Sequence, residues 1–190
     1  MKKMRFISVT AFIVAIAVTA MLNSCKKISE ELKYDLPLQI GNEEIIVLAP
    51  TSDTTAEHII GSGTNSCNID SFVRANTKNV LGVNNINSVK LTACTVFIHN
   101  GSTINNFANL ESCYTSFYST GNTTPFQVVL ASNPATYSTV LNLPVDPTIN
   151  LKSYIKGNDF FYNIGAKLRK PITDSLRCTI EYTFSVNVLG

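Results

Sequence analysis

Four of the five cysteines lie in the body of the chain: Cys67, Cys94, Cys113 and Cys178. Thiols can form disulfides, bind a metal or fill space in an apolar core. No two of these four are separated by only two residues, and such wide spacing argues against a zinc site. Their even number is compatible with disulfides in an oxidising compartment, where four cysteines allow three connectivities. The place of Cys178 on the apolar face of its strand favours buried thiols instead. Four buried free thiols are the alternative.

Groups that could transfer protons are few. The two histidines, His58 and His99, are isolated, and the sequence contains no HExxH, GxSxG, Walker A or GxGxxG motif. Carboxylates occur in turn-like segments, where we expect them to cap turns: Asp53, Asp146, Asp159 and Asp174. A carboxylate pair for glycoside hydrolysis could be assembled only by the fold. We therefore expect no catalytic residues, no cofactor and no metal.

Aromatic residues offer a different kind of site. Tyr114, Phe117 and Tyr118 lie close together in the chain, and with Tyr137 they could form a platform for a sugar or a peptide. Packing in the core or across strands is the alternative reading of the same residues. The chain has no Trp, the residue with the largest stacking face, which weakens the case for a carbohydrate ligand.

The charge balance excludes one class of partner. The chain has 190 residues, with 15 Lys+Arg and 13 Asp+Glu, and 45% of its residues are hydrophobic. Lys2, Lys3 and Arg5 belong to a leader segment, and without them 12 basic residues stand against 13 acidic ones. A net charge near −1 leaves no basic patch for nucleic acid, so we expect a globular protein without a nucleic-acid partner.

The chain begins with a leader. Residues 1–5 form a positively charged head, Phe6 to Leu22 is an uncharged apolar run, and Leu22-Asn23-Ser24-Cys25 follows directly. This order is typical of a secretory signal. The run Leu-x-Ser-Cys resembles the lipobox of bacterial lipoproteins, although Asn23 departs from the small residue usual there. An uncleaved membrane anchor of 17 residues is the alternative, and it would be short for a bilayer.

The resemblance implies that residues 1–24 are a signal peptide, which would be helical, and that Cys25 is acylated. Two or three acyl chains would hold the protein on a membrane, and residues 25–32 would form a polar tether. Lys26 stands where inner-membrane lipoproteins commonly have Asp. The resemblance therefore implies a lipid-anchored protein of the cell outer membrane.

The element that organises the rest is the segment from Leu176 to Leu189, where apolar and polar residues alternate without interruption. A period of two over this length predicts one long strand with a buried and a wet face. Further strands are predicted at residues 54–60, 88–98, 107–118, 126–131, 139–143, 148–151 and 159–169. A short helix is predicted at residues 70–76, with Asp70 as its cap and residues 72, 73 and 75 facing inward.

Three hairpins follow from the turns between these strands. Gly41-Asn42 predicts a hairpin of residues 33–40 with 43–48. Residues 159–169 are predicted to pair with 176–189, with Tyr162 opposite Tyr182 and four further apolar pairs in the same register. A hairpin of residues 88–98 with 107–118 would bring Cys94 opposite Cys113, which leaves Cys67 for Cys178.

Strands of this number and spacing predict an all-β protein: residues 33–190 as one antiparallel β-sandwich, with a closed barrel as competitor. The layout resembles immunoglobulin-like sandwiches, without a shared motif. The predicted function is a non-catalytic, lipid-anchored envelope protein whose domain is structural or binds another envelope protein or a glycan. An enzyme or accessory acting on envelope polysaccharide, or a carrier of an apolar ligand, is the alternative.

Overall fold

The computed structural model describes residues 33–40, 44–47 and 53–190. The predicted signal peptide (residues 1–24), the tether (25–32), Cys25 and the turn Gly41-Asn42 lie outside the described residues. Within those ranges, none of the helices is both long enough and apolar enough to cross a membrane.

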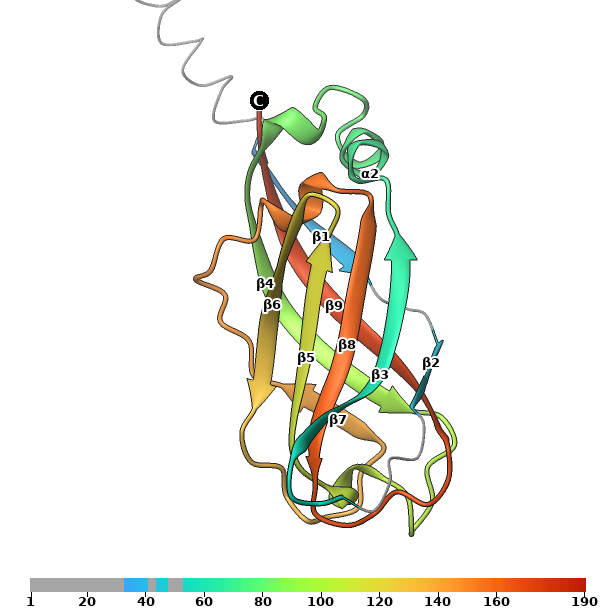
Figure 1. Cartoon of the computed structure of the whole chain (residues 1–190). Coiled ribbons are helices and arrows are strands. Elements are labelled where there is room, and N and C mark those ends of the chain that lie inside the picture. Colours follow the sequence, from blue (N-terminus) through green and yellow to red (C-terminus); the bar gives the residue numbers. More distant parts are fainter. Residues whose placement is uncertain (1–32, 41–43, 48–52) are drawn as a thin grey trace, which may run out of the picture.

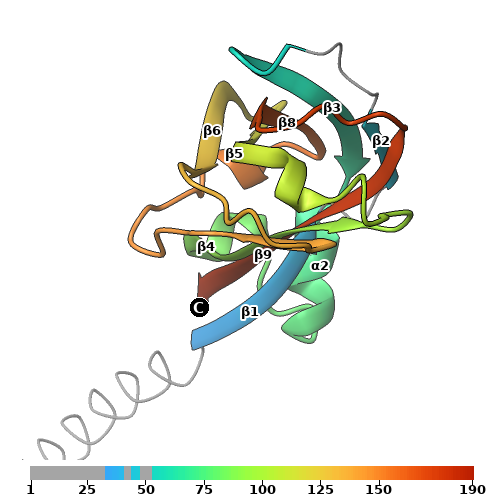
Figure 2. The ribbon, with the colours of Figure 1, turned by 90° about the horizontal axis from the view of Figure 1, so that it is seen from below.

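Two antiparallel sheets pack face to face, which confirms the predicted β-sandwich with one short helix (Figures 1 and 2). Sheet A has the order β1-β9-β4-β7, and β2 also pairs with β9. Its strands are β1 (Lys33–Ile40), β2 (Glu44–Val47), β4 (Ile86–Ile98), β7 (Val140–Leu143) and β9 (Leu176–Leu189). Sheet B has the order β3-β8-β5-β6, from β3 (Glu57–Ser66), β8 (Asp159–Leu168), β5 (Leu110–Ser119) and β6 (Asn122–Leu130).

The long strand β9 has the predicted bounds and lies in the interior of sheet A, between β1 and β4. Every second residue from Leu176 to Val188 is buried. Strands predicted at residues 126–131, 139–143 and 159–169 are present as β6, β7 and β8. The segment 148–151 is not a strand, because it forms a turn in which Asp146 accepts hydrogen bonds from the backbone and side chain of Thr148.

All three predicted hairpins are wrong. Strands β1 and β2 both run antiparallel to β9, at its C-terminal and N-terminal parts respectively, so they continue in one direction instead of folding back on each other. Strand β8 belongs to sheet B and β9 to sheet A. Their apolar faces do meet, but across the core. Strands β4 and β5 likewise lie in different sheets.

A β-bulge explains a change of phase in the β4 sequence. In a strand with simple alternation, Val89, Leu91, Ala93 and Phe97 would share one face. The register between β4 and β9 shifts between Leu91 and Ala93, which means that β4 has one extra residue there. Beyond this bulge, the residues that face the core are those at even-numbered positions instead of odd-numbered ones. As a result Val89 and Leu91 before the bulge, and Cys94 after it, all point into the core.

The helix α2 (Ile69–Asn76) closes one end of the sandwich (Figure 1). Its N-cap is Asn68, whose side chain accepts a hydrogen bond from the Ser71 N–H at 2.9 Å. Asp70 is therefore not the cap. Its carboxylate lies inside the first turn, where it accepts from the backbone of Val83 at 2.8 Å and from Arg74 at 2.7 Å. Ile69 and Val73 are buried, whereas Ala75 is exposed.

Candidate functional site

The predicted aromatic platform is divided by the alternation of β5. Phe117 is 2% exposed and packs in the core, with ring centroids 5.1 Å from Tyr182 and 5.3 Å from Tyr154. Tyr114 and Tyr118 point to the opposite side of the strand, where both are half-buried on the outer face of sheet B. Phe117 is therefore a core residue and the prediction that it belongs to the platform is wrong. Tyr137 is exposed between β6 and β7, outside the sheet.

The Tyr114 ring lies over the neighbouring strand β8. Tyr114 is paired with Gly165 of β8, and a Cβ atom at position 165 would collide with Cζ, Cε1 and Oη of Tyr114. The ring thus occupies the space that a side chain on β8 would need. Only glycine permits this arrangement, and the ring stays half-buried on the outer side of sheet B.

Two exposed aliphatic side chains flank this ring. Ile59 on β3 is paired with Gly165, and Val129 on β6 is paired with Tyr114. Ile59 is 65% exposed and Val129 is 50% exposed. Together with Tyr114 they form an apolar band that crosses all four strands of sheet B. Exposed apolar residues gathered in this way indicate a contact surface more strongly than single ones do.

A second aromatic group lies farther along the same face. Tyr118 and Phe161 are paired across β5 and β8, and their rings stack with centroids 5.0 Å apart and an interplanar angle of 14°. Phe161 and Gly165 are four positions apart on β8, which corresponds to about 13 Å along the strand. The face therefore carries two apolar bands.

A polar row lies between the two bands. It crosses the sheet through the paired residues Ser62, Asn163, Ser116 and Gln127. All four side chains are uncharged. Those of Ser62, Asn163 and Gln127 bring hydroxyl and amide groups to the surface, whereas Ser116 is buried. Charged residues lie only at the two ends of this side of sheet B: Lys167 pairs with Glu111 at 2.9 Å and Glu57 accepts from Ser112 at 3.5 Å at one end, and Asp159 lies at the other. We call the two bands and the polar row the sheet B face.

Three of the four cysteines are buried in the core: Cys94, Cys113 and Cys178. Burial raises the pKa of Cys94 to about 11 and the pKa of Cys113 and Cys178 to about 12. All four cysteines, including the half-buried Cys67, are free thiols in the structure. Burial also raises the pKa of Cys67, so the reactive thiolate form is disfavoured at each of them.

The hairpin argument for the disulfides does not hold, because β4 and β5 belong to opposite sheets. Cys94 and Cys113 nevertheless approach each other across the core. Cys94 Sγ lies 3.4 Å from Oγ1 of Thr115, two residues from Cys113. A bridge between them stays a prediction. Cys67 follows the end of β3 beside α2, whereas Cys178 pairs with Ile98 at the opposite end of the sandwich. This placement is incompatible with a Cys67–Cys178 bridge.

The remaining titratable groups serve local structure. Asp53 accepts hydrogen bonds from the backbone and hydroxyl of Thr55, which lower its pKa, and its other oxygen lies 3.2 Å from His58 Nε2. His99 lies 3.0 Å from the Thr179 hydroxyl. Asp159 accepts from Ser66 at 2.7 Å. Among the described residues, no group of three or more His, Cys, Asp or Glu could hold a metal ion.

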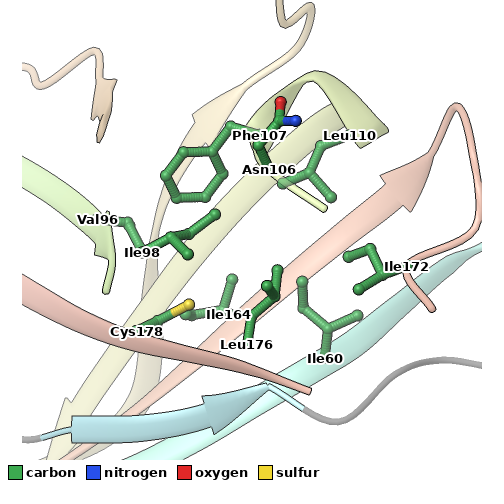
Figure 3. Close-up of a pocket in the computed structure, with 10 residues that line it drawn as sticks. All are labelled: Ile60, Val96, Ile98, Asn106, Phe107, Leu110, Ile164, Ile172, Leu176 and Cys178. Atoms are coloured by element: carbon green, nitrogen blue, oxygen red, sulfur yellow. The ribbon is translucent and has the colours of Figure 1, made fainter. Parts of the chain in front are cut away.

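Between the sheets lies a cavity of about 10 Å³ (Figure 3). Its lining is apolar apart from Asn106, which bonds to Ser102 and Ala108. This volume accommodates one water molecule at most. A carrier of apolar ligands would need several hundred Å³, so this cavity gives no support to that alternative.

Comparison with known proteins leaves the family open. No family model and no curated protein matches the chain. Among solved structures, a chain of infectious bursal disease virus has 12% identity and a TM-score of 0.38, over 82% of this chain and 33% of that one. This chain thus spans about a third of the viral chain's length. The structure of turnip yellow mosaic virus has 14% identity and a TM-score of 0.26, over 84% and 95%. Desmodium yellow mottle tymovirus has 7% identity and a TM-score of 0.24, over 83% and 90%. Similarity at this level does not extend to function.

Proposed function

We propose that this protein is a non-catalytic component of the cell envelope, held on the outer membrane through acylated Cys25, and that its sheet B face binds an envelope glycan. The observation that carries the binding proposal is the Tyr114 ring lying over Gly165 on the outer side of sheet B. The anchor rests on the sequence of the leader, which is separate from this observation.

The chemistry of the sheet B face favours a sugar chain over a protein partner. A pyranose ring has an apolar face that stacks on an aromatic ring, and hydroxyl groups at its edge that bond to amides and hydroxyls. The face offers both, because Tyr114 and Tyr118 are separated by the row that contains Asn163 and Gln127. The middle of the face has no charge, so the preferred glycan is an uncharged one. Ligand sites commonly combine aromatic surface with a few polar groups in this way.

The binding proposal is tested with the purified chain and neutral polysaccharide extracted from the envelope of its own source. We expect immobilised polysaccharide to retain the wild-type chain. Tyr114→Ala should weaken retention about tenfold, which corresponds to a loss of about 1.4 kcal/mol of binding free energy. Tyr114→Phe, which keeps the ring, should bind nearly as well.

Tyr137→Ala is the matched control, since Tyr137 is an exposed tyrosine away from the sheet B face. Equal retention of wild type and Tyr114→Ala would reject the site. Retention of an envelope protein in place of polysaccharide would make the partner a protein. Shortening of the polysaccharide chains during incubation would contradict the non-catalytic assignment and favour an enzyme.

The anchor has its own test. Cys25→Ser should abolish acylation, which is read from the mass of the N-terminal peptide, and should release the chain from the outer-membrane fraction. A wild-type N-terminal peptide without acyl chains would reject the anchor and leave the binding proposal intact.

A further inference from the structure

Positive charge is concentrated at the end of the sandwich where β1 begins. This end comprises residues 33–35, 68–90, 150–159 and 185–189, and we call it the lysine end. Figure 1 shows α2, the start of β1 and the C-terminus gathered there. Its basic residues are Lys33, Arg74, Lys78, Lys90, Lys152 and Lys156, and its acidic residues are Asp35, Asp70 and Asp159. The lysine end therefore has an excess of three positive charges.

The other described residues carry the opposite charge. They contain four basic residues, Lys167, Arg169, Lys170 and Arg177. Seven acidic residues accompany these: Glu44, Asp53, Glu57, Glu111, Asp146, Asp174 and Glu181. The described part of the chain is thus neutral as a whole, but the lysine end carries a charge of plus three and the rest of the described residues a charge of minus three. Such a division orients a molecule in an external field.

Two hollows open at the lysine end. One, of about 320 Å³, is lined by Val83, Asn84, Lys152 and Lys156. The other, of about 540 Å³, lies on the outer face of sheet A and includes Lys33, Lys90 and Asp35 in its lining. Each hollow therefore presents two ammonium groups.

The fold holds the two hollows side by side along residues 83–90. The side chain of Asn85 donates to the Leu189 carbonyl at 3.2 Å, and Leu189 is paired with Lys33. On the other side of β4, the Leu151 N–H donates to the Val89 carbonyl at 2.7 Å, which places Lys152 beside this strand. The four lysines of the hollows thus surround the beginning of β4.

These lysines are not neutralised by neighbours. Among the described residues, none of Lys33, Lys90, Lys152 and Lys156 forms an ion pair. The acids of this end are engaged elsewhere. Asp35 accepts from Asn187 at 2.8 Å, Asp70 pairs with Arg74 at 2.7 Å, and Asp159 accepts from Ser66. The ammonium groups are therefore available to an anion outside the molecule.

We propose that the lysine end lies against the membrane and that its hollows bind the phosphate groups of anionic lipids. The inference rests on the proposed attachment of the N-terminus to a membrane. Lys33 is eight residues from Cys25, so a fully extended connection reaches at most about 29 Å. Attraction between exposed charges and an anionic surface is screened within about 8 Å at physiological ionic strength. Contact therefore requires the lysine end to be the part of the domain nearest the lipid.

This orientation has a consequence for the binding face. The strands of sheet B run from the lysine end toward the opposite end of the sandwich (Figure 1). With the lysine end on the lipid, the sheet B face stands sideways to the membrane and stays open to a glycan. Each lysine close to an anionic surface strengthens the attraction roughly fivefold.

The test uses the chain purified from membranes in detergent and reconstituted into vesicles, either of phosphatidylcholine alone or of phosphatidylcholine mixed with phosphatidylglycerol. Backbone hydrogen exchange is then compared between the two. We expect exchange of residues 83–90 and 150–157 to slow at least about fivefold in the anionic vesicles. The slowing should disappear in 0.5 M salt, which shortens the screening length to about 4 Å. It should also disappear in the double variant Lys152→Gln/Lys156→Gln. The matched control Lys167→Gln/Lys170→Gln, at the other end, should retain it.

Unchanged exchange in the two vesicle types would overturn the proposal, and so would slowing confined to residues 57–66 and 112–118 of the sheet B face. The outcome is independent of the acyl group. A chain held by an uncleaved leader also places its N-terminus in the vesicle, and the mass of the N-terminal peptide reports acylation separately.

Discussion

The rings of Tyr162 and Tyr182 meet edge to face across the core, with centroids 6.4 Å apart and an interplanar angle of 60°. Tyr162 belongs to β8 in sheet B and Tyr182 to β9 in sheet A. The two strands are consecutive in the chain, yet they share no backbone hydrogen-bond ladder. The contact between these rings therefore joins the two layers.

The two tyrosines should respond differently to loss of the hydroxyl. Tyr182 Oη is buried and makes no hydrogen bond, although Thr115 lies near it, whereas Tyr162 Oη donates to the Thr64 carbonyl at 3.4 Å. Tyr182→Phe should raise the free energy of unfolding by about 1 kcal/mol, because a buried unsatisfied group is removed. Tyr162→Phe should lower it by about 0.5–1 kcal/mol. Urea unfolding of both variants measures the difference, and a destabilised Tyr182→Phe would show that its hydroxyl is bonded.

The buried thiols should make stability depend on alkaline pH. Burial holds the pKa of Cys94 at about 11 and that of Cys113 and Cys178 at about 12, above the ordinary value of 9.0. Above pH 9 the unfolded chain loses protons that the folded chain retains, so unfolding becomes more favourable. Each thiol should lower the free energy of unfolding by about 1.4 kcal/mol per pH unit between the unfolded and folded pKa. Urea titrations of the reduced protein from pH 8 to 10 test this, and Cys113→Ala should show a shallower slope.

Counting thiols in protein kept under oxidising conditions shows whether Cys94 and Cys113 are free or form a disulfide. If Cys94 and Cys113 form a disulfide across the core, denatured protein should gain two reactive thiols after reduction. Closing this loop should raise the free energy of unfolding by about 3 kcal/mol. Equal thiol counts before and after reduction would show that the cysteines act only as small core residues.

The sequence predicted which face of a strand is buried better than which strand lies beside it. Alternation from Leu176 to Val188 fixes an inner and an outer face, and it was confirmed residue by residue. The same alternation in β8 is compatible with a hairpin and with packing across the core, because both bury Tyr162 and Tyr182. The connection of residues 169–175 is long enough to cross the roughly 10 Å between sheets. Nothing local decides between the two arrangements.

In the candidate site, too, the sequence predicts the face on which a residue lies but not the residue beside it on the next strand. The period of two places Tyr114 and Tyr118 on one side of β5 and Phe117 on the other, so this part could be predicted from the sequence. The role of Gly165 could not, because it depends on the register between β5 and β8. The rows of the sheet B face likewise exist only once four strands are aligned. A glycine in the middle of an apolar strand was the one local signal.

Arg169 follows β8 and fixes the backbone segments around the start of β5 and after β6 through hydrogen bonds that the apolar–polar pattern of the strands does not predict. Its guanidinium donates to the carbonyls of Ala108 and Leu110 at 2.9 and 3.0 Å, and to that of Asn133 at 2.6 Å. Arg169→Met keeps the length of the side chain but removes these bonds. We expect the free energy of unfolding to fall by about 2–3 kcal/mol. Lys170→Met, at the neighbouring exposed position, should change it by less than about 0.5 kcal/mol. Similar losses in both variants would contradict this role of the guanidinium.

The packing of Tyr114 on Gly165 can be measured without a ligand. Gly165→Ala places a methyl group where the Tyr114 ring lies, so the ring must move and the free energy of unfolding should fall by about 1–3 kcal/mol. In a Tyr114→Ala background the same change should be neutral or stabilising, since alanine suits a strand better than glycine. A double-mutant cycle by urea unfolding should therefore give a coupling of about 1–3 kcal/mol. Gly165→Ala alone should also weaken glycan retention, because the ring that stacks on the sugar is displaced while its chemistry is unchanged. Additive effects in the cycle would mean that the ring does not lie on Gly165 in solution, which would remove the observation on which the sugar site is based.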